Sequence, residues 1–183
     1  MPIGVYVDNN VWDFLFDRGM NLSVELPKDR FALCLTREAE FEIPPLASKR
    51  PELYAFIQDT IKSCSIPTDY IFGFYDDSLP RDQQRYGGFD QGRFMSEEEH
   101  AFIQQQRQPL QQPRPKRPTG LYKDEADTAI AARSFRSVVL SLDRKKGPIN
   151  SAYQQGGTVV FLTDFAGSGL SLADFITRNV SAA

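Results

Sequence analysis

The sequence predicts an α/β fold: a three-layer α/β/α sandwich with a mainly parallel central sheet. Short apolar, β-branched runs bounded by turn signals alternate along the chain with stretches of helical pattern. Such alternation is typical of a parallel sheet that is covered by helices on both faces. The 183 residues suit a single domain spanning 1–183, and 41% hydrophobic with 25% charged residues fits a soluble globular protein.

The first half of the chain is expected to alternate between strands and helices. An apolar run predicts a strand over 3–7, and a mixed apolar and acidic stretch opens a helix within 11–16. A second apolar run predicts a strand over 31–35. Thr36 is a suitable N-cap for a helix over 37–43, because its side-chain oxygen can accept a hydrogen bond from an unpaired amide of the first turn.

The pattern continues towards the carboxyl terminus. A helix is predicted over 51–63, because proline stands at its first position and apolar residues recur on one face. A short strand is predicted over 70–75. The remaining elements are expected in the order helix, strand, helix and strand, over residues 124–135, 138–142, 149–154 and 158–162.

Residues 76–120 break the alternation and are predicted to form a long central insertion or loop. Within them, Gln104–Pro118 carries four basic residues and no acid, and its four prolines exclude a regular helix and favour extended backbone. This segment could hold RNA phosphates or be a solvated loop. Ser96 is expected to cap a helix that begins at Glu97, because serine is a good N-cap and acids suit the first turn.

Composition limits the classes of function. The net charge of −3 gives no overall field for nucleic acid, so contact with a polyanion requires a local basic patch. No apolar run approaches the ~20 residues that cross a bilayer, and no secretory signal is visible. Cys34, Cys64 and the single His100 cannot supply four zinc ligands of the nitrogen and sulfur kind. The low cysteine count fits a cytoplasmic location.

Acidic residues stand where predicted strands end. Asp8 follows the first strand, and Asp143 follows the apolar part of the strand over 138–142. The predicted helices add acids around Glu38–Glu42 and Asp124–Asp127. Carboxyl ends of parallel strands share one edge of the sheet, where ligands collect. Carboxylate oxygens are the ligands that Mg²⁺ and Mn²⁺ prefer, so the pattern predicts a site for such a cation.

Several segments resemble the PIN domain, a nuclease fold named after a pilus-protein N-terminus. Val5–Val11 resembles the opening strand of that family, with its aspartate and a small polar residue two positions later. Asp127–Ala132 is similar to its aspartate-led, alanine-rich helix, and Val138–Asp143 to the strand that ends in a hydroxyl residue and an aspartate. Gly156–Leu162 resembles its closing strand. The resemblance covers residues 3–63 and 121–165.

The resemblance implies one acidic site, whose catalytic and metal-binding residues are Asp8, Glu42, Asp127 and Asp143. For the second acid, Glu38, Glu40 and Glu42 compete within one predicted helix. The family's spacing of an apolar residue, two further residues, glutamate and an apolar residue favours Glu42, with Glu38 next. Because Glu38 and Glu42 stand four positions apart, they share a helix face, and one could bind the ion while the other supports it.

Polar and basic neighbours complete the implied site. Asn10 and Ser141 match positions that usually support the acids by hydrogen bonding. Arg144 and Lys145 directly follow Asp143 and could bind the phosphate backbone of a substrate, although a surface turn explains them equally well.

The expected reaction is hydrolysis of phosphodiester bonds, of RNA rather than DNA, with Mg²⁺ or Mn²⁺ as cofactor. The resemblance implies either the toxin of a toxin–antitoxin pair, inhibited by an antitoxin protein, or an RNA-processing enzyme; a homodimer would also fit the family. The alternative is a catalytically silent PIN-fold binding or assembly module. A phosphate-receiver domain is disfavoured, because Asn9 and Asn10 follow Asp8 where a second acid is expected and Asp164 stands in place of a lysine.

Overall fold

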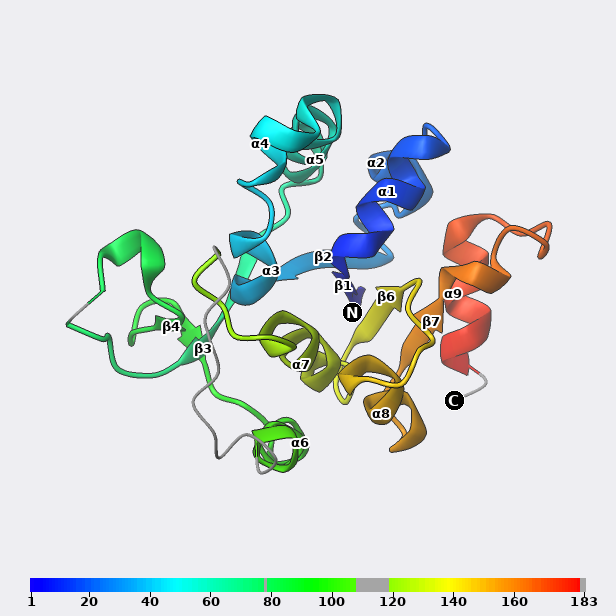
Figure 1. The fold of residues 1–183 in the computed structure, drawn as a ribbon. Helices are drawn as coiled ribbons and strands as arrows, with labels where there is room; N and C mark the ends of the chain where they lie inside the picture. Colours follow the sequence, from blue (N-terminus) through cyan, green and yellow to red (C-terminus); the bar gives the residue numbers. More distant parts are fainter. Residues whose placement is uncertain (78, 108–118, 182–183) are drawn as a thin grey trace.

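A mainly parallel sheet runs through the middle of the protein and confirms the predicted α/β class (Figure 1). The computed structural model describes residues 1–77, 79–107 and 119–181. The strands are β1 (Ile3–Val7), β2 (Phe31–Thr36), β3 (Thr68–Phe72), β4 (Tyr86–Gly87), β5 (Gly92–Arg93), β6 (Val138–Ser141) and β7 (Val159–Phe161). Their order is β4-β3-β2-β1-β6-β7, with β5 also paired to β3. Every strand pairing among the described residues is parallel.

Helices connect the strands. They are α1 (Asn9–Asp17), α2 (Leu22–Glu25), α3 (Arg37–Phe41), α4 (Leu46–Lys49), α5 (Pro51–Cys64), α6 (Glu97–Arg107), α7 (Glu125–Arg133), α8 (Pro148–Gln154) and α9 (Leu172–Ser181). Two short 3₁₀ turns, η1 (Arg81–Gln83) and η3 (Leu162–Asp164), complete the description. No helix in the described part of the chain has the length and apolar character needed to cross a bilayer.

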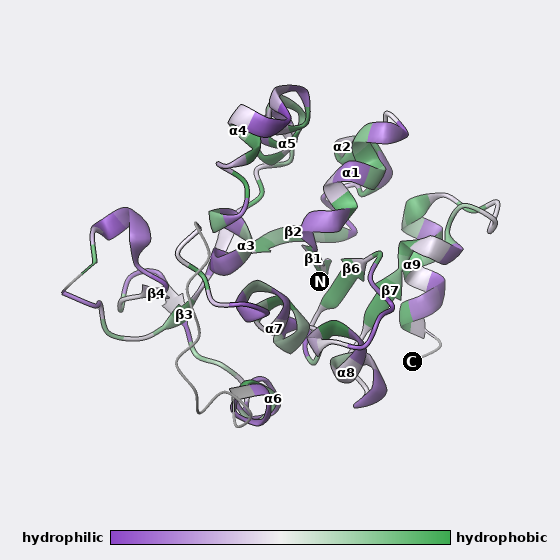
Figure 2. Cartoon of the chain, in the orientation of Figure 1, coloured by the Kyte–Doolittle hydropathy of each residue, from purple (hydrophilic) through white to green (hydrophobic). Residues whose placement is uncertain are grey.

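Successive side chains of each strand point to opposite faces of the sheet and create two cores. On β1, Val5 and Val7 pack into a large cluster with residues of α1, α2, α5 and α9, whereas Tyr6 packs into a second cluster with residues of α6, α7 and α8. Apolar strands with polar outer helix faces are visible in Figure 2. The helices therefore form two layers, as predicted for a three-layer sandwich.

Local signals located most elements correctly. The strand over 3–7 is found with the predicted bounds, and the predicted helix over 51–63 corresponds to α5. Thr36 caps α3, because its Oγ1 accepts a hydrogen bond from the Ala39 amide at 3.1 Å. Ser96 caps α6 reciprocally: its Oγ accepts from the Glu99 amide at 3.2 Å, and Glu99 Oε2 accepts from the Ser96 amide at 2.8 Å.

Three predicted boundaries need correction. The helix expected over 37–43 ends at Phe41, ahead of the two prolines at 44 and 45, which lack amide donors. The strand expected over 70–75 begins and ends earlier, over Thr68–Phe72, because its pairing with β2 starts at Thr68. The segment Gln104–Pro118 was expected to exclude a regular helix, but α6 continues through Arg107; the remainder, 108–118, lies outside the described residues.

The described part of residues 76–120 contains two short strands and a helix, whereas a long insertion or loop was predicted. β4 and β5 both pair with β3 and extend the sheet, and Phe102 of α6 is buried in the second core. The single histidine, His100, lies on the exposed side of α6, as expected for an ordinary helix residue. That this region is an insertion stays a prediction.

A buried network of ion pairs joins four elements on the second-core side of the sheet. Asp69 on β3 accepts hydrogen bonds from Arg133 Nε of α7 at 2.8 Å and from Arg93 Nε of β5 at 2.9 Å. Arg93 also donates from Nη1 to Glu99 Oε2 of α6 at 2.8 Å. The side chains of Arg133 and Glu99 are 1% and 0% exposed, whereas Arg93 is 35% exposed, so the network is buried at Arg133 and Glu99 and reaches the surface at Arg93.

Candidate functional site

Asp8 stands at the carboxyl end of β1, in the centre of the sheet. Its amide donates to the Leu140 carbonyl of β6 at 3.0 Å. This hydrogen bond extends the pairing of β1 with β6 by one residue beyond Val7. The next residue already begins α1, so Asp8 sits at the strand-to-helix turn with only 7% of its surface exposed. The backbone of Asp8 is therefore fixed by strand pairing on one side and by the start of α1 on the other.

Two polar side chains hold the Asp8 carboxyl group. Its Oδ2 accepts hydrogen bonds from Ser141 Oγ at 2.7 Å and from Asn10 Nδ2 at 2.6 Å. Asn10 is itself fixed, because its Oδ1 accepts from the Leu142 amide at 3.0 Å. Ser141 Oγ also accepts from the Asp143 amide at 3.0 Å. These residues therefore join the ends of β1 and β6 through one hydrogen-bonded cluster.

The surroundings of Asp8 disfavour its negative charge. Burial and, to a smaller extent, the negative charge of Asp127 raise the pKa of Asp8 to about 6, although the hydrogen bond from Ser141 opposes the shift. Asp127 lies in the first turn of α7, so this helix brings a second carboxylate into the electrostatic range of Asp8. Repulsion between such carboxylates is what a bound divalent cation relieves.

Glu42 is linked to this cluster through Asn9, the residue next to Asp8. Asn9 Nδ2 donates to Glu42 Oε2 at 2.7 Å and to the Ala39 carbonyl at 3.3 Å. The end of α3 is thereby attached to the start of α1. Asn9 was not predicted as part of the site; its position directly after an acid at a strand end was the available signal.

Glu38 has different neighbours from Glu42. Burial raises the pKa of Glu38, while the charge of Arg133 opposes the shift and those of Glu125 and Asp69 add to it. Among the described residues, its Oε2 is buried without a hydrogen-bond partner. Glu38 thus lies near the buried ion-pair network, whereas Glu42, the C-cap of α3, lies near Asn9. The prediction that the two glutamates share one helix face is therefore wrong.

Asp143 and the basic residues after it form an exposed turn beyond β6. Asp143 Oδ1 accepts from the Lys145 amide at 2.8 Å, and both side chains are exposed. Arg144 points towards the end of β7. It pairs with Asp164, donates from Nε to Thr163 Oγ1 at 3.2 Å and stacks on the ring of Phe161. Lys145, unlike Arg144, has no ion-pair partner among the described side chains.

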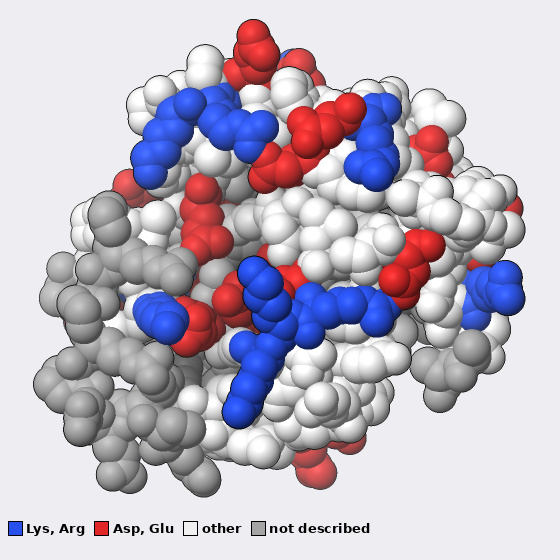
Figure 3. Space-filling model, turned by 45° about the vertical axis from the view of Figure 1, so that its right-hand side comes forward, with Lys and Arg blue, Asp and Glu red and all other residues white. Residues whose placement is uncertain are grey.

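Figure 3 shows a group of basic side chains in the middle of one face, with acidic side chains on either side of it, so the positive charge on that face is local. Asp164, the other acid at a strand end, is paired with Arg144 and does not join the Asp8 cluster. A polyanionic substrate would therefore meet only local positive charge here, chiefly around Lys145.

Asp127 acts on the charge of Asp8, and Glu42 and Asp143 are linked to its neighbours by hydrogen bonds, but the acids do not form a ready-made metal cluster. Within the described ranges, no three His, Cys, Asp or Glu side chains are grouped closely enough to hold an ion. The chemistry of the donors nevertheless fits Mg²⁺ or Mn²⁺, because every candidate ligand is an oxygen. Asn9 Oδ1, beside Asp8, is a further buried oxygen without a hydrogen-bond partner in the described part of the chain.

Comparison of the chain with protein-family models, with curated proteins and with solved structures yields no match. Function must therefore be inferred from the residues and their geometry.

Proposed function

We propose that this chain is a metal-dependent nuclease that hydrolyses phosphodiester bonds of RNA at the site around Asp8. One observation carries the proposal: Asp8 is buried at the end of a central strand, and no lysine or arginine among the described residues pairs with it. A buried carboxylate without a cationic partner is costly. A divalent cation bound by Asp8 and Asp127 would offset this cost and the repulsion between the two carboxylates.

The four acids have distinct places in the proposed site. Asp8 and Asp127 would hold the ion from β1 and α7, with Glu42 and Asp143 completing the ligand set from the ends of α3 and β6. When bound, Mg²⁺ or Mn²⁺ lowers the pKa of a coordinated water and neutralises charge on a phosphate oxygen. Asp8 or Asp127 would also position the attacking water. Lys145 would contact the phosphate backbone.

The PIN family is part of the same proposal. The order of the acids along the chain, and their support by Asn10 and Ser141, agree with the resemblance described above. Within that family the chain would be the toxin of a toxin–antitoxin pair or an RNA-processing enzyme, and a homodimer would fit either role. A cytoplasmic location is supported by two free cysteines, Cys34 and Cys64.

A catalytically silent PIN-fold binding module is the alternative. It is favoured by one observation, the lack of a preassembled group of metal ligands in the described residues. The two proposals differ in whether purified protein cleaves RNA at all.

Cleavage assays on paired variants test the proposal and identify the second acid. Glu42→Gln should lower the initial rate on labelled single-stranded RNA with Mn²⁺ by at least about 10–100-fold, because it removes an anionic ligand. Glu38→Gln should change the rate by less than about 3-fold, because this side chain lies near Arg133 and Asp69 and not at the Asp8 cluster. Glu52→Gln, on the exposed face of α5, is the matched control.

Two outcomes would count against this account. Wild-type protein that cleaves no RNA with either Mg²⁺ or Mn²⁺ would favour the silent module. Loss of activity in Glu38→Gln with full activity in Glu42→Gln would move the second acid to Glu38.

A further inference from the structure

Several aromatic side chains beyond the end of β3 are exposed to an extent unusual for their type. Phe74, Phe89 and Phe94 are 83%, 85% and 74% exposed, and Tyr75 is 53% exposed. Large apolar side chains gathered on a surface mark a site of interaction more often than isolated ones do. None of these residues takes part in the Asp8 site.

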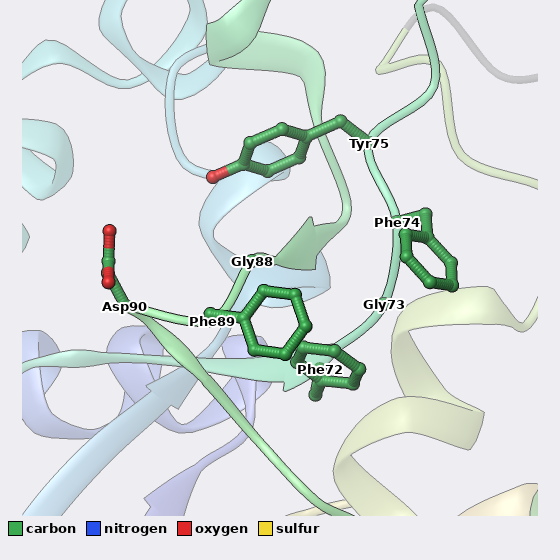
Figure 4. Close-up of a pocket in the computed structure, with 7 residues that line it drawn as sticks. All are labelled: Phe72, Gly73, Phe74, Tyr75, Gly88, Phe89 and Asp90. Atoms are coloured by element: carbon green, nitrogen blue, oxygen red, sulfur yellow. The ribbon is translucent and has the colours of Figure 1, made fainter.

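The rings form one continuous surface around Phe72, the last residue of β3. Phe72 lies 4.9 Å from Phe89, 4.8 Å from Phe94 and 6.3 Å from Phe74, measured between ring centroids. Together with Tyr75, these residues are called the aromatic surface below. Figure 4 shows that Phe72 and Phe89 lie against each other and that the Tyr75 hydroxyl points to the side on which Asp90 lies.

The backbone beneath the aromatic surface is closely packed and therefore preorganised. A Cβ atom on Gly87 would lie 2.7 Å from the Gly92 nitrogen, and one on Gly92 would lie 2.5 Å from the Phe72 Cα, so only glycine fits at these positions. The adjoining loop is fixed by Gln84, whose Oε1 accepts from the Asp76 amide at 2.8 Å and whose Nε2 donates to the Leu79 carbonyl at 2.7 Å.

A pocket of about 270 Å³ opens in the aromatic surface, and its lining combines flat rings with one acid, Asp90. Two further acids nearby in the sequence, Asp77 and Asp82, are also exposed. The basic residues of this stretch are Arg81 and Arg85, of which Arg85 is paired with Glu125 at 2.6 Å. No basic residue of the described chain lines the pocket, so the negative charge of Asp90 disfavours a phosphate backbone and attracts a cationic partner.

We propose that the aromatic surface binds an extended, proline-rich peptide that carries arginine or lysine. Proline rings pack on flat aromatic faces, and the polyproline II conformation is already formed in the free peptide, so little entropy is lost on binding. The Tyr75 hydroxyl can donate to a peptide carbonyl, since such a helix leaves its carbonyls unpaired. Asp90 would pair with the basic residue, and this interaction is independent of the nuclease proposal.

The test uses a labelled synthetic peptide of alternating proline and arginine, titrated with the full chain by fluorescence anisotropy. Wild-type protein should bind it, with weaker binding at higher salt. Phe89→Ala should weaken binding about 10-fold or more, and Asp90→Asn several-fold with a smaller dependence on salt. Both side chains are exposed, so folding should be retained; Val24→Ala, an exposed position on α2, is the control.

Three outcomes would overturn the proposal. The first is failure of the wild-type chain to bind the peptide at protein concentrations up to about 1 mM. The second is equal binding by the Phe89→Ala variant, or equal binding of a peptide whose prolines are replaced by alanine. The third is occupation by another partner: self-association, or binding of single-stranded RNA, that Phe89→Ala abolishes while the peptide does not bind.

Discussion

Asp8→Asn should abolish RNA cleavage and at the same time make the metal-free protein more stable. The activity is lost because the variant removes an anionic ligand from the centre of the proposed site. Stability rises because asparagine is neutral, whereas burial and Asp127 raise the pKa of Asp8 to about 6 and make its charge unfavourable. The side-chain oxygen of the introduced asparagine can still accept from Asn10 and Ser141, as Oδ2 of Asp8 does.

The pH dependence of the effect has a definite sign. The pKa of Asp8 is about 6 in the folded protein, against an ordinary value of 3.8, so the folded state binds the proton more tightly than the unfolded state. Asp8 therefore lowers the free energy of unfolding as the pH rises from about 4 to 6, and the loss is constant above that range. At full ionisation this amounts to about 3 kcal/mol.

Urea unfolding of wild type and variant between about pH 4 and pH 8 measures this difference directly. The variant should gain up to about 3 kcal/mol over wild type above pH 6 and much less near pH 4. Asp59→Asn, on the exposed face of α5, should show no comparable gain. A variant that is less stable than wild type throughout, or whose advantage does not grow with pH, would show that the charge of Asp8 is well tolerated.

Asp69→Asn should destabilise the fold more than other isosteric changes of an acid. Asp69 is the one carboxylate that pairs with both Arg133 and Arg93 among the described residues, and the Arg133 side chain is only 1% exposed. Removing this charge leaves the buried Arg133 guanidinium without its ion-pair partner, a loss that costs about 3–5 kcal/mol for a buried pair. Thermal or urea unfolding measures the loss. Asp13→Asn breaks an exposed pair with Arg50 and should cost no more than about 1 kcal/mol.

The ion-pair network also makes the stability of the fold depend on pH. Burial alone would raise the pKa of Asp69, but the charge of Arg133 and the hydrogen bond from Arg93 outweigh it, so its pKa lies below the ordinary value. Its contribution to stability is therefore present at neutral pH and is lost as the pH falls through the lowered pKa. Asp69→Asn should remove this part of the acid sensitivity. An unchanged free energy of unfolding would mean that Arg133 finds another partner.

Sequence patterns located the parts of this structure that depend on local physics. The strand over 3–7 and the caps at Thr36 and Ser96 follow from neighbours a few residues away, and they were predicted correctly. Asp8 and Asp143 share an edge of the sheet because strands β1 and β6 are parallel and adjacent, which the alternation of elements also implied.

Features that depend on distant partners could not be predicted. Asp69, Arg93 and Arg133 look like ordinary surface charges in the sequence, and only the packing of α6 and α7 against β3 and β5 makes them a buried network. The choice between Glu38 and Glu42 could not be predicted for the same reason. Both stand at one short helix, and their different neighbours, Arg133 and Asn9, come from other parts of the chain.

Calorimetric titration with Mn²⁺ tests the proposed metal site most directly. Wild-type protein should bind Mn²⁺ with saturable heat, and binding should be stronger at pH 8 than at pH 5, because Asp8 must lose its proton to coordinate the ion. Asp8→Asn should weaken binding at least about 10–100-fold, while Asp59→Asn leaves it unchanged. Equal Mn²⁺ affinity in wild type and Asp8→Asn, or no binding by the wild-type chain, would contradict a metal site at Asp8.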